Sequence, residues 1–386
     1  MIQYIYIDGI EIELDTVAHD VSITVGRKDT TTTYAPSSCR ITFYDVIAET
    51  YTALVGKRLN VYSGEARNFG GFITDVRLSV ATETSGARCD IIAAGPSSRL
   101  GLFQVSTPGY ATQTVTDRLA SISADMFALD NSVKYTNQTG TDEGLYTLSA
   151  EPAGTFSGIS GMVDVLQQVG GCLYDLPNEP LATVTPTGIG SVAYYTNDYF
   201  STEYYEPGAF QVAFAPIFDQ SAQIINTITV TYDTGTITRS NAASQALYGP
   251  RARLVSTNIN NATDATDLAD ELISRERRPR WSMSDVTIEQ GLLEIPVVQI
   301  GTELNITNLP AGSPTSNYLG IVQGWEHRYT NGTHRTTYYL ADPAEVGQAL
   351  PWNKIPDTSS YQWDSINPTT IWDNALTLSD IEGIAV

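Results

Sequence analysis

The first hundred residues are dominated by short runs in which hydrophobic and polar positions alternate. In the opening run, Ile10, Ile12 and Leu14 alternate with acidic residues, and this period of two turns one face of a strand inward and the other toward water. The Asp8-Gly9 pair before the run favours the type I′ turn of a hairpin. Further strand-like runs follow at residues 21–25, 39–45, 58–62, 71–80 and 89–94. The pattern predicts a small β-barrel over residues 1–103.

Helical spacing replaces this alternation over residues 104–215. Two segments carry an apolar face with the spacing of a helix. The first face consists of Val115, Leu119, Ile122 and Met126, and the second of Met162, Val165, Leu166 and Val169. Ser160 is a candidate N-cap of the second helix, and Gly170-Gly171 end it. Because strand-like runs follow, we expect an α+β domain here.

Residues 216–345 return to the β pattern, with one helix inside. A hairpin is predicted at 225–239, and the Asn331-Gly332 pair favours another hairpin turn near the end of the region. Between them lies an apolar helix face formed by Ala265, Leu268, Ala269, Leu272 and Ile273. We therefore expect a second β-barrel over 216–345, with a helical insertion at about 242–280.

Three blocks of the first β region recur in the second. Residues 56–62 (GKRLNVY) match 301–307 (GTELNIT), 69–78 (FGGFITDVRL) match 318–329 (YLGIVQGWEHRY), and 88–96 (RCDIIAAGP) match 335–343 (RTTYYLADP). The blocks keep their order, and such ordered self-similarity indicates an internal duplication. The predicted fold is mainly β with an α+β insertion: two tube-like β-barrels per chain, duplicated, flanking an α+β domain.

Composition and charge narrow the classes of function. The chain has 386 residues, with 21 Lys or Arg, 43 Asp or Glu and a formal net charge of −22. This charge repels nucleic acid and anionic membrane surfaces, which disfavours specific nucleic-acid binding. Neither a signal peptide nor an 18-residue apolar run is recognised, so we expect synthesis in a cytoplasm and no stable membrane insertion. Cys39, Cys89 and Cys172 lie far apart, which favours buried thiols and leaves one disulfide as an alternative.

Two motifs have a chemical interpretation that must be weighed against a simpler one. Residues 188–193 (GIGSVA) match the dinucleotide-binding fingerprint, but no helix-forming segment follows them. His327 and His334 flank a predicted hairpin turn, with Glu326 nearby. A metal or general-base role for this pair competes with two half-exposed strand histidines.

An acidic pair at a helix start is the remaining catalytic candidate. Asp264 and Asp267 have the residue type of glycosidase carboxylates. Acidic side chains also complement the dipole at a helix N-terminus, and this explanation suffices. We therefore expect no enzyme activity, no cofactor and no metal.

Three groups of residues are candidates for contacts with other molecules. Tyr194, Tyr195, Tyr199, Tyr204 and Tyr205 suit sugar stacking or a protein interface, with buried strand packing as the alternative. Arg275, Arg277, Arg278 and Arg280 suit ion pairs with an acidic neighbouring subunit, although cations are favoured at a helix C-terminus anyway. Residues 346–386 carry Trp352, Trp363 and Trp372 without sustained periodicity, which predicts an extended C-terminal arm that packs on a neighbouring surface.

The order of these motifs resembles the tail hub (baseplate hub) proteins of long-tailed bacteriophages, which are related to the hubs of contractile injection systems. The first barrel segment (56–100), SQALYGPRARL at 244–254, and the last barrel segment (300–343) carry the resemblance. Many relatives have Asp where this chain has Thr302, so the last motif is imperfect. The resemblance covers most of residues 1–345.

The resemblance implies a structural virion component at the tail tip. The implied hub is a homotrimer that joins the six-fold tail tube and the ring of distal tail protein to three-fold tip proteins. It would hold the end of the tape measure protein and close the tube until genome ejection. An acidic lumen would let DNA pass without binding it. The alternative is a tail-associated protein that binds cell-envelope carbohydrate or degrades the cell wall.

Overall fold

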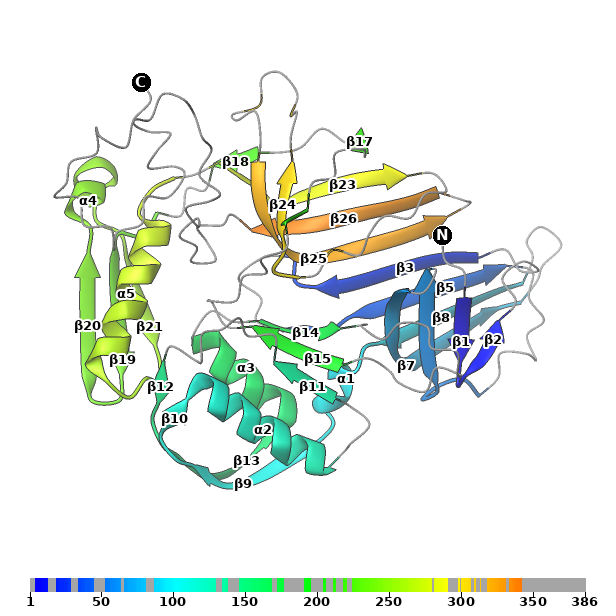
Figure 1. Cartoon of the computed structure of the whole chain (residues 1–386), viewed down its shortest axis with the longest axis horizontal. Coiled ribbons are helices and arrows are strands. Elements are labelled where there is room, and N and C mark those ends of the chain that lie inside the picture. The colour runs from blue at the N-terminus through cyan, green and yellow to red at the C-terminus, as the bar shows by residue number, and fades with distance from the viewer. Residues whose placement is uncertain are drawn as a thin grey trace.

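The chain is arranged as one large β-sheet with two smaller α/β regions beside it (Figure 1). The computed structural model describes residues 4–12, 19–28, 34–44, 53–63, 66–80, 87–129, 134–137, 146–168, 172–176, 191–195, 204–205, 211–212, 218–220, 224–279, 281–290, 298, 300–306, 309, 313, 318–330 and 333–341. The predicted mainly β fold is confirmed.

The large sheet draws its strands from both ends of the described chain. Its members are β1 (Tyr4–Ile7), β2 (Ile10–Ile12), β3 (His19–Gly26), β5 (Ser38–Tyr44), β6 (Arg58–Ser63), β7 (Ala66–Ser79), β8 (Arg88–Ala94), β16 (Tyr204–Tyr205), β17 (Gln211–Val212), β23 (Asp285–Gln290), β24 (Glu303–Ile306), β25 (Tyr318–Thr330) and β26 (Thr333–Ala341). The order is β17-β23-β26-β25-β3-β5-β8-β7-β6-β1-β2, and β24 lies between β25 and β16. The two predicted β regions are therefore joined through the pairing of β3 with β25.

Local patterns explain why these strands form. In β26, buried and half-buried residues alternate from Thr333 to Leu340, as expected for a strand with one face in a core. Asp8 and Gly9 have φ of 50° and 81°, which are the positive values that a type I′ turn requires. The predicted hairpin between β1 and β2 is confirmed.

The middle region combines helices with small sheets, mostly within residues 104–195. It contains α1 (Ser97–Leu100), α2 (Val115–Leu129), α3 (Gly158–Gln168), β4 (Tyr34–Ala35), β9 (Gln104–Tyr110), β10 (Gln113–Thr114), β11 (Lys134–Asn137), β12 (Thr147–Leu148), β13 (Glu151–Ser157), β14 (Cys172–Leu176) and β15 (Ser191–Tyr195). The apolar stripe of α2 is buried as predicted. The N-cap prediction for Ser160 is wrong, because α3 begins at Gly158 and the Ser157 hydroxyl accepts from the Ser160 N–H.

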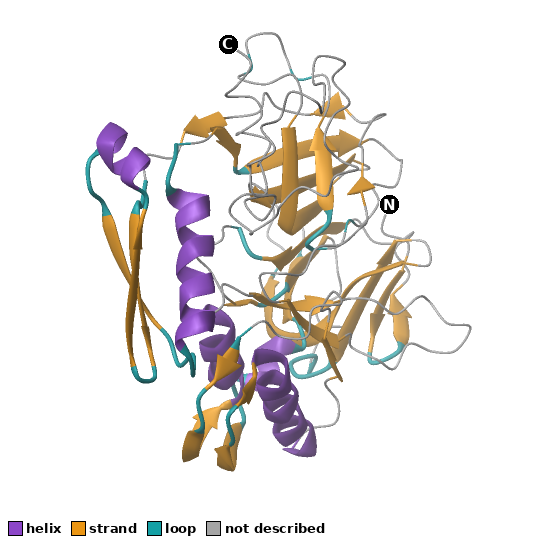
Figure 2. Ribbon diagram, turned by 60° about the vertical axis from the view of Figure 1, so that its left-hand side comes forward, coloured by secondary structure: helices purple, strands orange, loops and turns teal. Residues whose placement is uncertain are grey.

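The predicted hairpin at 225–239 forms, but it does not join the large sheet. β19 (Thr227–Tyr232) pairs with β20 (Gly235–Ser240) and β21 (Ala252–Ser256) in a separate sheet. Two helices accompany it, α4 (Ala242–Tyr248) and α5 (Ala262–Glu276). Figure 2 shows α5 between this sheet and the rest of the molecule. Its predicted apolar face is buried except for Leu272, which is half-buried.

Two apolar cores correspond to this division. One lies within the large sheet and includes Ile23, Phe43, Phe69 and Trp325. The other is shared by α2, α3 and α5 with the small sheets and includes Leu119, Met162, Ile228 and Leu268. The helical insertion at 242–280 thus packs with the middle region, because its apolar faces are buried in the same core.

Candidate assembly surface

The large sheet contains the same four-strand arrangement twice. The first four-strand unit has the order β6-β7-β8-β5, and the second has the order β24-β25-β26-β23. Leu59 stands opposite Gly71 in the first, and their sequence counterparts Leu304 and Gly320 stand opposite each other in the second. β5 and β23 also correspond, although the three sequence blocks did not include them. The sequence repeat is therefore a repeat of strand pairing.

A β-bulge occurs at the same place in both units. The register shifts between Ile73 and Asp75 in β7, and between Val322 and Gly324 in β25. A bulge bends its strand and increases the local twist. Each long strand is thereby divided. We name residues 324–329 the outer half of β25, and residues 75–80, which extend one residue beyond the end of β7, the outer half of β7.

In the second unit, β3 covers the free edge of the outer half of β25. This pairing, named the seam, runs from Gly324 opposite Gly26 to Tyr329 opposite Val21. A Cβ on Gly324 would lie 2.6 Å from the Val25 carbonyl oxygen, so only glycine allows this approach.

Arg27 closes the seam at the bulge. Its backbone N–H donates to the Gln323 carbonyl over 3.0 Å. Its Nε donates to the Gln323 side-chain oxygen over 2.8 Å, and both side chains are buried. Because the residue inserted by the bulge accepts both bonds, the bulge and the seam stabilise each other.

In the first unit, the corresponding edge has no strand on it within the described residues. β8 pairs with the outer half of β7 on one side, and β6 pairs only with the inner half. Leu78 and Val80 are 41% and 80% exposed, whereas their counterparts His327 and Tyr329 are 0% and 7% exposed. This apolar, unpaired edge is the candidate assembly surface.

The two strand histidines are buried, so the expectation of half-exposed side chains is wrong. His334 Nε2 lies 3.0 Å from His327 Nδ1, and Thr336 Oγ1 lies 2.6 Å from the same His327 nitrogen. Burial lowers the pKa of His334 to about 3 and lowers the pKa of His327 as well, with the second ring adding to the effect. Both rings are therefore neutral at physiological pH.

The histidines belong to a cluster of aromatic rings. His334 stacks on Tyr329 with ring centroids 4.1 Å apart, and Trp325 lies 4.2 Å from His327. Across the described part of the chain, no three His, Cys, Asp or Glu residues are grouped in a way that would hold a metal ion. Asn68 donates to the Tyr329 hydroxyl over 3.0 Å, which joins β7 to the second unit.

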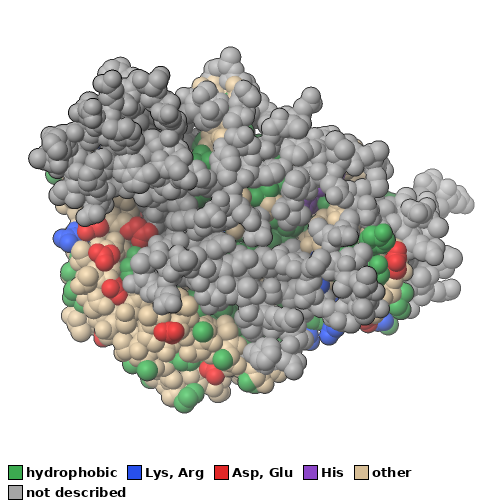
Figure 3. All heavy atoms as spheres, in the orientation of Figure 1, with side chains coloured by type: hydrophobic (Ala, Val, Ile, Leu, Met, Phe, Trp, Pro, Cys, Tyr) green, Lys and Arg blue, Asp and Glu red, His purple; other side chains and the backbone are tan. Residues whose placement is uncertain are grey.

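The predicted arginine and acidic groups lie around α5. Arg277 is the C-cap residue, its carbonyl accepts from the Ser244 hydroxyl, and Arg278 is exposed. The side chains of Arg275 and Arg280 lie outside the described residues. Figure 3 shows acidic side chains gathered over the region of α5.

The acidic pair is divided between two roles. Asp264 accepts the Thr147 N–H over 2.7 Å and so holds α5 against β12, whereas Asp267 is exposed. This division favours a structural explanation of the pair over catalysis.

The predicted aromatic groups are only partly described. Tyr194 and Tyr195 lie in β15, and Tyr204 and Tyr205 lie in β16 beside β24. Their side chains lie outside the described residues, as do Tyr199, Trp352, Trp363 and Trp372. The contact roles of these residues therefore stay predictions.

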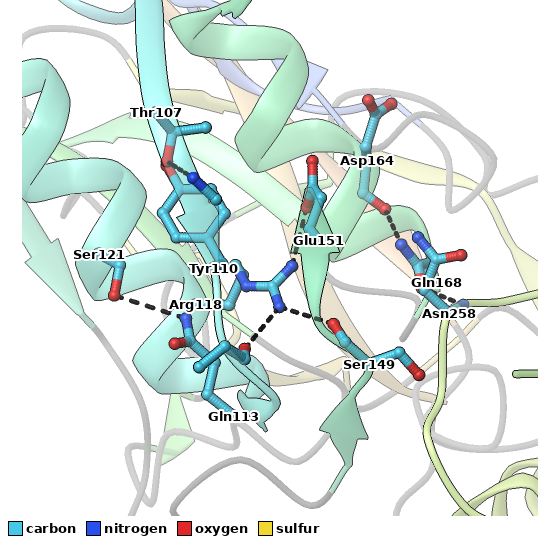
Figure 4. A network of polar contacts seen from close by, with 12 residues as sticks. Thr107, Tyr110, Gln113, Arg118, Ser121, Ser149, Glu151, Asp164, Gln168 and Asn258 are labelled. Carbon is cyan, nitrogen blue, oxygen red and sulfur yellow. Dashed lines mark hydrogen bonds and ion pairs between the residues drawn. The ribbon is translucent and has the colours of Figure 1, made fainter. Parts of the chain in front are cut away.

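Arg118 anchors a polar network in the middle region that sequence reasoning missed (Figure 4). It is 2% exposed and donates to Glu151 over 2.8 Å, to the Ser149 carbonyl over 2.8 Å and to the Ala111 carbonyl over 3.1 Å. Its guanidinium also lies over the Tyr110 ring. These contacts hold α2 against β9 and β13, because a buried guanidinium needs several acceptors.

Asp175 anchors the first unit to the middle region. It is 2% exposed and accepts from the Ser37 N–H, the Ser37 hydroxyl and the Ser97 N–H over 2.7–2.8 Å. Burial raises the pKa of this carboxyl, while the serine hydrogen bonds oppose the increase. A Cβ on Gly95 would lie 2.2 Å from the carboxylate, so glycine is required beside it.

Cysteine and membrane predictions are tested in part. Cys39 and Cys89 are buried free thiols as expected, and the side chain of Cys172 lies outside the described residues. Among the described helices, none has the length and apolar character that a bilayer crossing requires.

Comparisons with known proteins find similarity only at the level of structure. No protein-family profile and no curated protein matches the sequence. The tail protein from Neisseria meningitidis MC58 aligns over 89% of this chain and 97% of its own, with a TM-score of 0.60 and 11% identity. The 43 kDa tail protein of prophage MuSo2 from Shewanella oneidensis aligns over 90% and 99%, with a TM-score of 0.58 and 12% identity.

A secretion-system protein has a similar fold. The E. coli c3393 protein, described as a component of the type VI secretion system similar to the T4 tail proteins gp27 and gp5, aligns over 89% of this chain and 78% of its own. The TM-score is 0.51 and the identity 11%. The chain therefore has the fold shared by these tail proteins and by the type VI secretion system protein.

Proposed function

We propose that this protein is a structural, non-enzymatic hub at the tip of a phage tail. The observation that carries the proposal is the repeated four-strand unit, with matched registers and bulges, in a chain that has a phage tail fold. Each unit, with its adjacent strands, would form one tube-like barrel. A hub needs this repetition because it joins assemblies of different symmetry.

The repeated unit would let a three-fold assembly bind a six-fold one. Three chains with two barrels each present six similar surfaces, and a six-fold tail tube can bind six similar surfaces. Closed rings arise from heterologous, head-to-tail contacts, in which the first barrel of one chain meets the second barrel of the next. We infer a homotrimer with pseudo-six-fold symmetry.

The proposed partners follow from this position. The six-fold side would contact the tail tube and the distal tail protein, and the three-fold side would contact further tip proteins. The lumen would hold the tape measure protein and later pass DNA, and an excess of carboxylates on its wall would keep DNA from binding. Residues 346–386 would dock on a neighbouring chain through their tryptophans.

Light scattering and electron microscopy of the purified full chain test the proposal. We expect the mass of a trimer and three-fold particles with six similar densities around a channel. Labelling of native phage with an antibody against the chain should mark the tail tip. A monomer at all concentrations, or label along the tail shaft, would overturn the hub role. A lysis band from the purified chain on bacterial cell wall would favour the enzyme alternative instead.

A further inference from the structure

We propose that the outer half of β7 accepts strands from a second copy of this chain, and that these strands are β17 and β18. The proposal rests on the homotrimer described above and names the edge that holds it together. Strand addition to a free edge supplies main-chain hydrogen bonds, and alternate side chains supply specificity.

The second unit shows how such an edge is covered. Within one chain, β3 pairs with β5 of the first unit on one side and with the outer half of β25 on the other. β3 therefore belongs to the first unit and completes the second. The seam is one contact between two successive units, and it is built into every chain.

The counterpart of β3 in the second unit lies at the edge of the sheet. β17 pairs antiparallel with β23, the counterpart of β5, with Val212 opposite Ile288. β18 (Phe218–Gln220) pairs antiparallel with β22 (Trp281–Met283), which directly precedes β23. In the described residues neither β17 nor β18 has a strand on its other side.

Each chain thus has an unpaired strand edge at β17 and β18 and a second unpaired edge at the outer half of β7, within the described residues. Figure 1 places β17 above β23 and β18 to the left of β24, both far from β7 at the other end of the sheet. The two cannot meet within a chain, so the contact that matches the seam must join two chains. Repetition of one such head-to-tail contact produces a closed ring.

Side chains on the open edge fit this contact. The counterparts of Val76, Leu78 and Val80 are Trp325, His327 and Tyr329, which are all less than 9% exposed. Tyr329 reaches Asn68 of the first unit, so the covered face of β25 packs inside the neighbouring unit. An uncovered apolar strand edge is a liability that folded proteins usually avoid.

The open edge differs from the seam at one position, and this difference determines where the added strand begins. The counterpart of Gly324 is Asp75, and its side chain prevents the close approach that Gly324 permits. Asp75 instead pairs with Arg77 over 2.8 Å at the surface. The added strand therefore covers residues 76–80 and leaves Asp75 at its rim.

A single charge on the open edge tests the surface. In Val80→Glu, a carboxylate replaces a side chain that is exposed in one chain and buried in the proposed contact. We expect the association of full-length chains to weaken at least tenfold by light scattering, with an unchanged melting temperature of the dissociated chain. Leu247→Glu is the matched control, because Leu247 is 76% exposed and lies on α4, at the opposite side of the molecule from β7 in Figure 1. It should leave association unchanged.

A pair of cysteines tests the register. Thr24 stands opposite both Ser38 and Glu326 in the seam. By the repeat, Met283 corresponds to Ser38, so Phe218, opposite Met283, corresponds to Thr24, and Arg77 corresponds to Glu326. We expect Arg77→Cys/Phe218→Cys to form disulfide-linked dimers and trimers with copper phenanthroline as the oxidant. Arg77→Cys/Leu247→Cys should stay monomeric under denaturing, non-reducing conditions.

The outcomes separate this inference from the proposed function. Chains that never associate would overturn both. A trimer that withstands Val80→Glu and gives no disulfide-linked species from the Arg77/Phe218 pair would refute the strand addition and leave the trimer intact. Weakened association together with a cross-linked ladder supports the proposed edge.

Discussion

The outer halves of β7 and β25 have the same backbone arrangement and opposite surroundings. Both follow a bulge and pair with the next strand in the same register. In β25 the outer half is covered by β3 and carries Trp325, His327 and Tyr329 at its buried positions. In β7 the equivalent edge is uncovered in the described residues and carries smaller aliphatic side chains.

The difference teaches that strand pairing and side-chain size are set by different constraints. Pairing and bulge position are backbone properties, so they persist through the duplication although most side chains have changed. The size and polarity of the side chains depend on what covers each strand. Large rings fill the interior beneath the seam, whereas Leu78 and Val80 on the open edge are exposed.

The sharpest way to break the comparison is to add a side chain at the seam. Gly324→Val would place Cβ within 2.8 Å of three backbone atoms of β3 and the residue after it. Backbone cannot move aside as a flexible side chain can, so we expect a loss of about 3–4 kcal/mol in the free energy of unfolding. Urea unfolding of the full chain measures it.

The repeat supplies the control for this variant. Asp75, the counterpart of Gly324, already has a Cβ and lies on the open edge. Asp75→Val should therefore change the stability of the single chain by less than about 0.5 kcal/mol. Equal losses in the two variants would contradict the assigned difference between the edges.

A second prediction concerns the attachment of the first unit to the middle region. Asp175→Ala would leave the buried Ser37 and Ser97 N–H groups without their acceptor. We expect a loss of about 3 kcal/mol in unfolding free energy, since each unsatisfied buried donor costs about 1–3 kcal/mol. Asp164→Ala on the exposed side of α3 is the control and should cost less than about 0.5 kcal/mol. A similar loss in the control would show that the anchor is unimportant.

Much of the fold follows from local patterns. The α2 stripe, the α5 face, the Asp8-Gly9 turn and the repeated blocks were predictable, because each depends on residues near one another in sequence. The repeat even indicated equivalent strands, since matched glycine and leucine positions reflect matched pairing.

The contacts that join distant segments were not predictable in the same way. β3 and β25 are about 300 residues apart, and the sequence of neither strand indicates that it pairs with the other. The hairpin at 225–239 looked like a barrel strand pair, because period-two alternation does not reveal which sheet a strand enters. Burial of Arg118, Asp175 and the histidines was missed for a related reason: a charged or polar residue in sequence resembles a surface residue until its partners are known.

A third prediction uses acid to separate the two units. Burial lowers the pKa of His334 to about 3, and the pKa of His327 is lowered too, whereas unfolded histidine titrates near 6.5. Their contribution to stability is complete above pH 6.5 and is lost as the pH falls toward the folded-state values, because the unfolded chain binds protons first. We expect His334 alone to account for a loss of roughly 3 kcal/mol between pH 7 and pH 4, with His327 adding to it.

Substitution in the second unit should remove this acid sensitivity. Leu78 is the counterpart of His327, so His327→Leu has a residue that the repeat already uses, and His334→Phe keeps a ring against Tyr329. Urea unfolding at several pH values should show a flatter acid limb for the double variant. An unchanged slope would mean that the histidines do not cause the acid loss.

The smallest effect distinguishes two surface ion pairs, one in each outer half. Glu326 pairs with Arg328 and also accepts from the Tyr339 hydroxyl, whereas Asp75 pairs with Arg77 and its side chain is 44% exposed. Burial alone would raise the pKa of Glu326, but Arg328 and Tyr339 lower it overall, so its stabilising effect is present above about pH 4.5 and is lost in acid.

We expect Glu326→Gln to cost about 1 kcal/mol and Asp75→Asn about 0.3 kcal/mol in unfolding free energy at neutral pH. Molar salt should abolish most of the Asp75 effect and little of the Glu326 effect, because exposed charges are screened more than covered ones. Equal costs with equal salt dependence would show that the cover provided by β3 does not reach this far along the strand.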